Sequence, residues 1–280
     1  MRTIDSHEIE HVVARLCQEA NIDLGPDIEQ ALQQALWTEP APAGRAVLAE
    51  LIENAALARR ERLPICQDTG MAVIFVKLGQ DVHITGGDLT AAINRGVARG
   101  YREGYLRASV VSDPLLRVNT GDNTPAVIHY DIVPGEQIAI TVAPKGFGSE
   151  NMSAVRLFSP SAGIEGVRQF VLDTIRAAGS NPCPPIIVGV GLGGSLEKCT
   201  QLAKEALLRP VGEHNPAPHL HELEVELLAA ANRTGIGPSG LGGRTTALAV
   251  QVEAYPTHIA SLPVAVNMSC HATRHAQAIL

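Results

Sequence analysis

Apolar residues recur at helical spacing through the first sixty residues of the chain. Behind Asp5 and Glu8, which have the spacing of a capping box, apolar side chains return every third or fourth position as far as residue 20. Two further stripes of this kind cover residues 28–36 and 47–55. The pattern predicts a helical opening segment over about residues 1–62.

Beyond this segment, strand and helix patterns alternate. Ala72 to Val76 form an uninterrupted apolar run, which is typical of a strand buried on both faces. Asp88 then has the position of a helix cap before an apolar stripe over residues 89–97. The same reasoning predicts helices over 164–175, 195–208 and 218–232, and strands over 186–190, 246–254 and 259–266.

Two further strand patterns flank a turn. Val127–Ile132 and Ile138–Val142 lie on either side of Pro134-Gly135, which predicts an antiparallel hairpin. The expected fold class is therefore α/β, with the helical N-terminal segment followed by mixed, partly antiparallel sheets and packed helices. We find no linker or internal repeat, so we expect one domain over residues 1–280 with no separate second domain.

Composition and charge narrow the classes of function. The chain is 45% hydrophobic and 18% charged, as expected of a globular protein. Its formal net charge of −7 disfavours binding to the phosphate backbone of nucleic acids. No apolar run reaches the roughly 18 residues that a membrane-spanning helix needs, and the first residues lack a signal-peptide pattern. We expect a cytoplasmic protein with no nucleic-acid or membrane partner.

The five cysteines fall into two groups. Cys17 and Cys199 lie on apolar stripes of predicted helices, where a thiol packs as a small hydrophobic side chain. Cys66, Cys183 and Cys270 lie instead in turn-like segments rich in Pro, Gly and Asn. Three thiolates could hold a metal centre that keeps one coordination position open, as Lewis-acid catalysis requires. The chain has no Cys-x-x-Cys pair, so spacing alone leaves this reading open.

Other motifs give weaker signals. The segment Gly189 to Gly194 satisfies G-x-G-x-x-G, but the βαβ unit of a dinucleotide site is missing after it. The segment Gly237 to Leu241 lacks the last glycine of a serine-hydrolase elbow. His271 and His275 could chelate a metal or simply lie at the surface.

Three basic residues lie beside glycine or small residues, namely Arg107, Lys145 and Arg244. In a chain with negative net charge they could clamp a carboxylate substrate, because a guanidinium offers two parallel donors to a carboxylate. The alternative is that each pairs with an ordinary surface Glu or Asp. The sequence leaves both possibilities open.

Several segments considered together resemble one family. They are Cys66-Gln67-Asp68-Thr69-Gly70, Asn119 to Asn123, Lys145 to Asn151, Cys183-Pro184-Pro185, Gly235 to Pro238, and His258 with Cys270. In this order, and over nearly the whole chain, they resemble the iron-sulfur (class I) fumarate hydratases. The resemblance implies an iron-sulfur hydro-lyase domain of the N-terminal type.

The resemblance also implies a cofactor. Cys66, Cys183 and Cys270 match the family positions that hold a [4Fe-4S] cluster whose fourth iron binds the substrate. An open iron can stabilise the charge that develops beside a substrate carboxylate when water adds to the neighbouring double bond.

Five further positions match family residues at the substrate. Gln67 and Asp68 match residues that meet the substrate, and Asp68 is a candidate acid or base. Arg107 matches a carboxylate-binding arginine, the Gly148 backbone approaches the substrate, and His258 belongs to the polar network of the site. From the residues alone, without the resemblance, the better explanation is that Asp68 is a turn residue and His258 an ordinary loop histidine.

Single-chain members of the family continue into a second, swivelling domain, and this chain stops ten residues after Cys270. It therefore resembles the α subunit of the two-subunit form, and we expect a hetero-oligomer with a β subunit that supplies the base and further basic residues. Residues 107–109 and 145–151 favour fumarate and malate over tartrate, although Phe147 replaces a common glycine. Tartrate and mesaconate remain open as substrates. A non-catalytic cluster-binding assembly module is the alternative of another class.

Overall fold

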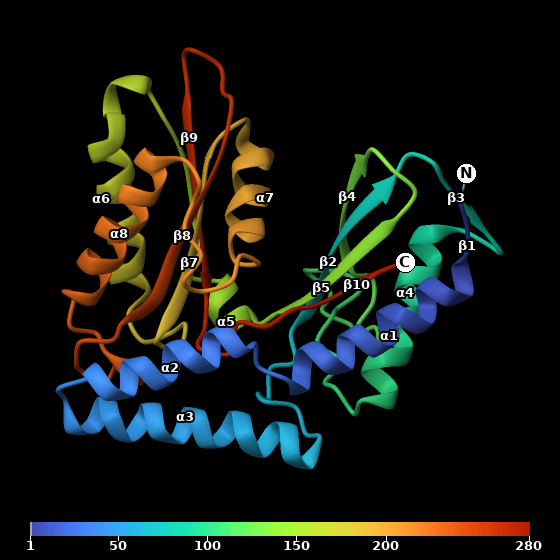
Figure 1. The fold of residues 1–280 in the computed structure, drawn as a ribbon, viewed down its shortest axis with the longest axis horizontal. Coiled ribbons are helices and arrows are strands. Elements are labelled where there is room, and N and C mark those ends of the chain that lie inside the picture. The colour runs from blue at the N-terminus through green and yellow to red at the C-terminus, as the bar shows by residue number, and fades with distance from the viewer. Residues whose placement is uncertain (1) are drawn as a thin grey trace. The chain divides into compact units, whose positions relative to one another are not determined.

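The computed structural model describes residues 2–280, which form two compact units. Unit 1 consists of the chain up to Leu24, together with Leu57–Phe147 and Arg274–Leu280. Unit 2 consists of Gly25–Ala56 and Gly148–Thr273. Mixed sheets covered by helices make up the core of each unit, which confirms the predicted α/β class (Figure 1).

Unit 1 packs two helices on one face of a four-stranded sheet. The sheet has the order β10-β5-β2-β4, with bounds β2 (Met71–Gly79), β4 (Val127–Val133), β5 (Ile138–Lys145) and β10 (Ala276–Ile279). Helices α1 (Ser6–Ile22) and α4 (Leu89–Glu103) cover it, and β1 (Arg2–Asp5) pairs in parallel with β3 (Val82–Thr85). Asp5 and Asp88 cap α1 and α4 as predicted, each accepting a backbone N–H bond.

Two glycines of α4 allow the close approach of α1. A Cβ atom at Gly96 would lie 2.7 Å from the carbonyl oxygen of Glu10, and one at Gly100 would lie 2.6 Å from that of Ala14. Any larger residue at either position would push the two helices apart. The pair buries Ile9, Val13, Ile93 and Val97 against the sheet.

The predicted hairpin of β4 and β5 was wrong. Strand β2 lies between them, parallel to β4 and antiparallel to β5. The reason is burial: β2 is apolar on both faces from Ala72 to Val76 and takes the central place, whereas β4 has no buried residue and lies at the sheet edge. The turn after β2 is hydrogen-bonded to the connection between β4 and β5. Gly79 N donates to the carbonyl of Gln137, and Gln80 N donates to the carbonyl of Val133, both at 2.8 Å.

Unit 2 contains a four-stranded sheet in the order β6-β9-β7-β8, with bounds β6 (Ala154–Phe158), β7 (Ile186–Gly193), β8 (Ala247–Tyr255) and β9 (Leu262–Ser269). Figure 1 shows α6 (Gly163–Ala178) and α8 (Pro218–Asn232) on one face and α7 (Leu196–Ala206) on the other. The main core lies under α6 and α8, where Val171, Val188 and Leu227 are buried.

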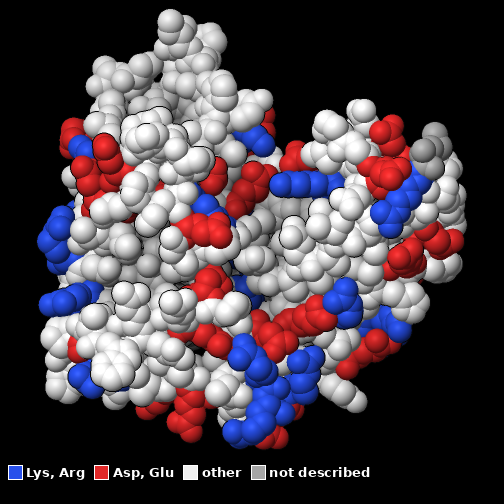
Figure 2. Space-filling view, in the orientation of Figure 1, with Lys and Arg blue, Asp and Glu red and all other residues white. Residues whose placement is uncertain are grey.

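The remaining helices complete the chain. Helices α2 (Pro26–Thr38) and α3 (Pro42–Glu61) confirm the predicted helical opening, and α5 (Phe147–Glu150) is a single turn. Two short 3₁₀ helices, η1 (Pro160–Ala162) and η2 (Pro238–Gly240), lie in unit 2. Acidic and basic side chains are interspersed on the face that Figure 2 shows.

The glycine motif that begins at Gly189 serves packing. A Cβ atom at Gly189 would lie 1.9 Å from the carbonyl oxygen of Ala203, and one at Gly191 would lie 1.9 Å from that of Cys199. Both carbonyls belong to α7, so the glycines let this helix lie directly on β7. The motif is accounted for without a phosphate ligand.

Candidate active-site residues

Asp68 is held in a fixed orientation within unit 1. Its Oδ1 accepts a hydrogen bond from Gly70 N at 3.0 Å, and its Oδ2 accepts one from Phe147 N at 2.9 Å. A carboxylate with one backbone donor on each oxygen cannot rotate freely, and each oxygen still has a lone pair for a proton or a substrate. Asp68 can therefore act both as the turn residue expected from the sequence and as an acid or base.

Glycines let the Asp68 loop lie against the start of the 145–151 segment. Gly70 has a φ of +73°, and a Cβ atom there would lie 2.8 Å from backbone atoms of Lys145. At Gly146 a Cβ atom would lie 3.2 Å from Asp68 Oδ2. The contact with Asp68 uses the Phe147 amide, and the Phe147 side chain is exposed, which explains how phenylalanine can replace a glycine here.

Thr69 ties the Asp68 loop to Arg107. Arg107 N donates to Thr69 Oγ1 at 2.9 Å, and this hydroxyl lies 3.3 Å from the Arg107 carbonyl oxygen, to which it donates. The Arg107 side chain is exposed and forms no ion pair with any residue of the 2–280 range. The surface-pair explanation therefore does not apply, and the guanidinium is available to an anion.

Two buried residues that the sequence analysis did not single out support the same loop. Arg274 is 5% exposed and donates from Nη2 to the Asp68 carbonyl at 2.6 Å, while its Nε donates to Asn21 Oδ1 at 3.3 Å. Tyr101 donates from its hydroxyl to the Thr69 carbonyl at 2.8 Å, and burial raises the pKa of Tyr101 so that it remains a donor. In the sequence, Tyr101 could have been found from its hydroxyl group, because it occupies a position of α4 that is otherwise apolar and buried.

Cys66 and Gln67 precede Asp68 on this loop. Cys66 is partly exposed and its Sγ lies 3.3 Å from Gln67 Oε1. Unit 1 therefore gathers Cys66, Gln67, Asp68 and Arg107 on two neighbouring segments.

Unit 2 brings Cys183 and Cys270 to the same end of its sheet. Cys183 precedes β7 and Cys270 follows β9, and these strands pair antiparallel with Ile187 opposite Ser269. The Cys183 carbonyl accepts a hydrogen bond from His271 N at 3.4 Å, and His271 Nδ1 lies 3.1 Å from the same oxygen. His271 thus joins the two cysteine loops.

The glycine-rich loop before β8 supports the Cys183 loop. Ser239 N donates to the Pro184 carbonyl at 2.8 Å, and a Cβ atom at Gly240 would lie 2.3 Å from that of Ser180. This loop is anchored in turn by buried Glu39, whose carboxylate accepts from Arg244 N and Thr245 N. The segment Gly237 to Leu241, which lacks the last glycine of a serine-hydrolase elbow, therefore helps to support the Cys183 loop.

Gly148 lies in unit 2 on an exposed stretch of backbone, where a Cβ atom would have only an ordinary contact with Asn181 O at 3.7 Å. Glu150 fixes the segment, because its carboxylate pairs with Lys204 and accepts from Asn267 Nδ2 at 3.0 Å.

The cysteines differ in accessibility as the sequence predicted. Cys17 and Cys199 are buried, and burial raises the pKa of Cys17 to about 12 and also raises that of Cys199. Metal ligation needs the thiolate, so these two are poor ligands. Cys66, Cys183 and Cys270 are partly or fully exposed on irregular backbone, and Cys183 has a φ of 55°. Their thiols are accessible and chemically suited to an iron-sulfur cluster.

His258 is not brought together with Cys183 and Cys270. It lies in the turn before β9, whereas Cys270 follows the other end of that strand. The eight residues of β9 span about 23 Å at the usual rise of a strand. Gly194 N donates to the Pro256 carbonyl at 3.2 Å, which keeps this turn at the far end of the sheet.

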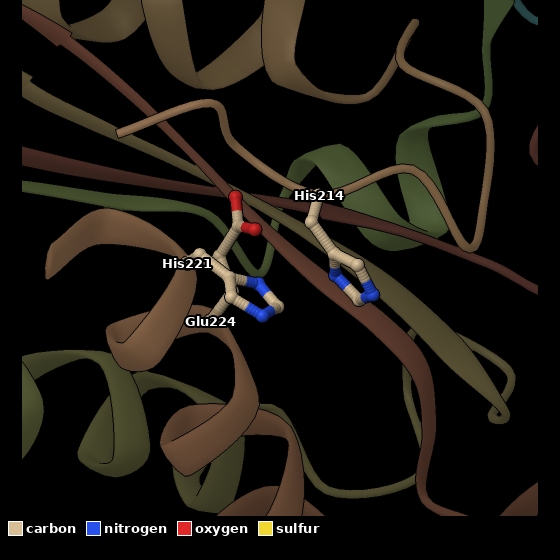
Figure 3. A group of neighbouring side chains, drawn as sticks. All are labelled: His214, His221 and Glu224. Atoms are coloured by element: carbon tan, nitrogen blue, oxygen red, sulfur yellow. The ribbon is translucent and has the colours of Figure 1, made fainter. Parts of the chain in front are cut away.

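A second polar group in unit 2 consists of His214, His221 and Glu224, whose ligand atoms lie within 4.8 Å of one another (Figure 3). The two rings are 4.1 Å apart between centroids. The buried Glu224 carboxylate is already paired with Arg209 and accepts from Asn215 N at 3.0 Å and Val252 N at 2.8 Å. We therefore assign Glu224 to holding the Arg209–Asn215 loop on β8.

Among residues 2–280, the structure contains no helix with the length and apolarity needed to cross a bilayer.

Comparison with known proteins shows the family of the chain. A family model described as fumarate hydratase (Fumerase) matches residues 10–279. A protein of Methanocaldococcus jannaschii named "Putative L(+)-tartrate dehydratase subunit alpha" is 42% identical over 275 residues, covering 96% of each chain. The L(+)-tartrate dehydratase subunit alpha of Escherichia coli strain UTI89 is 33% identical over 272 residues, covering 96% of this chain and 89% of its own.

Proposed function

The chain belongs to the fumarate hydratase family of hydro-lyases, and we propose that it is the α subunit of a two-subunit enzyme that reversibly hydrates fumarate to (S)-malate. The observation that carries the proposal is the family match over residues 10–279, within which unit 1 joins Asp68 to Arg107 and unit 2 joins Cys183 to Cys270. The subunit names of the relatives support a separate β subunit.

Cys66, Cys183 and Cys270 are the residues that would hold a [4Fe-4S] cluster. Bound there, the cluster would supply a Lewis acid for a substrate oxygen. The accessibility of these three thiols and the burial of Cys17 and Cys199 support this ligand set.

Arg107 binds a substrate carboxylate in this proposal, since its exposed guanidinium has two parallel donors for such a group. Gln67 and the Gly148 backbone supply further polar contacts to the dicarboxylate. Thr69 fixes the Arg107 backbone, so the position of the carboxylate relative to Asp68 depends on one buried hydroxyl.

Asp68 moves the proton. In hydration, one of its carboxylate oxygens accepts a proton from the attacking water. In dehydration, the resulting acid returns the proton to the leaving hydroxyl. The donors Gly70 N and Phe147 N hold the carboxyl plane in both directions. The proton on the neighbouring carbon is exchanged with a group of the β subunit.

His258 enters this proposal only through a second copy of the chain, because within one copy β9 separates it from Cys270. Mixing Cys183→Ser with His258→Asn tests this. Two variants that are each inactive and regain activity together would support a shared site. A fully active His258→Asn variant would remove His258 from the proposal.

Co-expression with the β subunit tests the function. We expect fumarate hydration by the anaerobically purified complex and almost none by the α subunit alone. A complex that is loaded with iron yet inactive on every dicarboxylate would contradict the proposal and favour the non-catalytic assembly module.

L(+)-tartrate is the second candidate substrate, favoured by the names of the two relatives described above. Dehydration of tartrate removes a hydroxyl beside a carboxylate, as dehydration of malate does, so the same residues would serve. The ratio of kcat/KM for (S)-malate and L(+)-tartrate decides between them, and mesaconate should be assayed in parallel. We expect the higher value for malate.

A further inference from the structure

Three potential metal ligands meet in unit 2, between the 209–217 loop and the first turns of α8. His221 and Glu224 are three residues apart on this helix and therefore share one face, and His214 comes from the loop. The carboxylate and the two rings turn toward one another (Figure 3), and their ligand atoms all lie within 4.8 Å of one another. The ligands of a tetrahedral zinc ion are about 3.4 Å apart, so rotation of the exposed His214 ring can close the group on one ion.

His221 has a ring nitrogen without a hydrogen-bond partner in the described part of the chain. Its Nδ1 atom is buried and takes part in no hydrogen bond there. The His214 ring lies beside the His221 ring, with the centroids 4.1 Å apart and the planes tilted by 56°, but it does not satisfy this nitrogen. A buried nitrogen is destabilising unless something binds it, and a cation on its lone pair would do so.

The loop that carries His214 is fastened to the same helix. The residue after His214 is buried Asn215, whose N–H donates to Glu224 Oε2 at 3.0 Å and whose Nδ2 donates to the Val252 carbonyl at 2.7 Å. Asn215 Oδ1 in turn accepts from Ala217 N at 2.9 Å. These bonds fix the backbone next to His214 against α8, so two of the three ligands and the backbone of the third are preorganised.

The partners of Glu224 decide which kind of cation fits. Its Oε1 accepts from Val252 N at 2.8 Å and from Arg209 Nη2, whereas its Oε2 accepts only the Asn215 N–H among residues 2–280 and keeps one lone pair. Arg209 also lies 3.7 Å from Glu253, so its charge is balanced by two carboxylates. Ca²⁺ and Mg²⁺ need several oxygen ligands, which the group does not offer. Two imidazoles with one carboxylate oxygen instead suit zinc and neighbouring transition metals.

We propose that His214, His221 and Glu224 bind a divalent transition-metal ion of the zinc class. His221 coordinates through its buried Nδ1, Glu224 coordinates through the remaining lone pair of Oε2, and water completes the coordination. Glu224 keeps its role of holding the loop, and the ion fastens the same loop to α8 through His214. The site uses none of the residues of the proposed hydro-lyase function, so the two proposals stand or fall separately.

Anaerobic calorimetric titration of the full chain with Zn²⁺ tests the proposal. His221→Asn and His214→Asn each remove one imidazole, and His219→Asn is the matched control, because His219 is exposed on the same helix and lies outside the group. We expect the first two variants to weaken the zinc dissociation constant roughly 100-fold or more, and the control to bind as the unmodified chain does. Exposed His214 can be replaced without disturbing the core, so this variant remains informative if His221→Asn fails to fold. Equal zinc binding by all four proteins, or equal loss in the control, would overturn the proposal.

A crystal of the full chain soaked in Zn²⁺ locates the ion and separates this site from the accessible cysteines, which can also bind zinc. Anomalous scattering at the zinc edge should give a peak about 2.1 Å from a ring nitrogen of both His214 and His221. Peaks at the cysteines with none between the two histidines would overturn the proposal.

Discussion

The Thr69 hydroxyl clamps the backbone of Arg107, accepting from its N–H at 2.9 Å and donating to its carbonyl at 3.3 Å. Thr69 follows Asp68 directly and is buried. One small side chain therefore sets the distance between the proposed proton carrier and the proposed carboxylate anchor. Thr69 acts as a positioning residue, since it reaches the substrate only through Arg107.

Thr69→Val should separate binding from chemistry. Valine keeps the shape but removes both hydrogen bonds, so we expect KM for (S)-malate to rise roughly tenfold while kcat changes less. Thr69→Ser keeps the hydroxyl and should restore KM. Equal KM values for the valine variant and the unmodified complex would show that the clamp has no part in substrate binding.

Asp68→Asn should lower kcat by roughly 10²- to 10⁴-fold, because the amide keeps the size of the side chain but cannot exchange the proton. Steady-state kinetics of the complex measure this, with the iron content determined on the same sample. If the asparagine variant loads iron normally and stays within threefold of full activity, Asp68 is only a turn residue.

Phe147 offers a matched pair of substitutions, because only its backbone N–H contacts Asp68. Phe147→Gly keeps this donor and should leave kcat nearly unchanged. Phe147→Pro removes it and should lower kcat by roughly tenfold. Equal loss in both variants would point to the aromatic side chain and against the hydrogen bond.

The division of the cysteines into buried packing residues and accessible cluster ligands predicts different outcomes for two serine variants. Cys183→Ser should lose the iron-sulfur absorbance and the activity, because an exposed turn thiol is removed. Cys199→Ser should keep both, since this thiol lies on the buried face of α7, where it packs with Ala203 and Ala265 and donates to the Leu196 carbonyl. Visible spectra and iron analysis of the anaerobic proteins provide the comparison, and equal cluster content in the two would refute the sorting.

Glu39 predicts a pH dependence of stability. Burial alone would raise the pKa of Glu39, but hydrogen bonds from the N–H groups of Arg244, Ala41 and Thr245 outweigh it and lower the pKa. The stabilisation is therefore present above the unfolded value near 4.3 and is lost as pH falls through the lower folded value. Glu39→Gln should lower the thermal midpoint at pH 7, and the difference from the unmodified complex should shrink below about pH 4. A difference that is constant with pH would contradict this assignment.

Local patterns predicted the helices well, because their signals are contained in short stretches. The caps at Asp5 and Asp88 and the buried faces of α1 and α4 are all present. The hairpin prediction failed because adjacency in sequence does not decide which strand is buried on both faces. That place belongs to β2, which comes some fifty residues before β4.

The residues of the candidate site were predicted mainly from the resemblance to a known family, and less from the chemistry and spacing of the residues themselves. Arg274 donates both to the Asp68 loop and to Asn21, which links opposite ends of the chain, and no periodicity signals such a pairing. His258 illustrates the reverse case. A motif placed it at the site, but the length of β9 places it at the other end of the sheet from Cys183 and Cys270.

Iron and sulfide analysis of the anaerobically prepared α–β complex measures whether Cys66, Cys183 and Cys270 hold a cluster. We expect about four iron and four sulfide ions per α chain, a brown protein and loss of both ions in a Cys66→Ser variant. A colourless complex that hydrates fumarate without iron, or an unaltered cluster in the Cys66→Ser variant, would contradict this expectation.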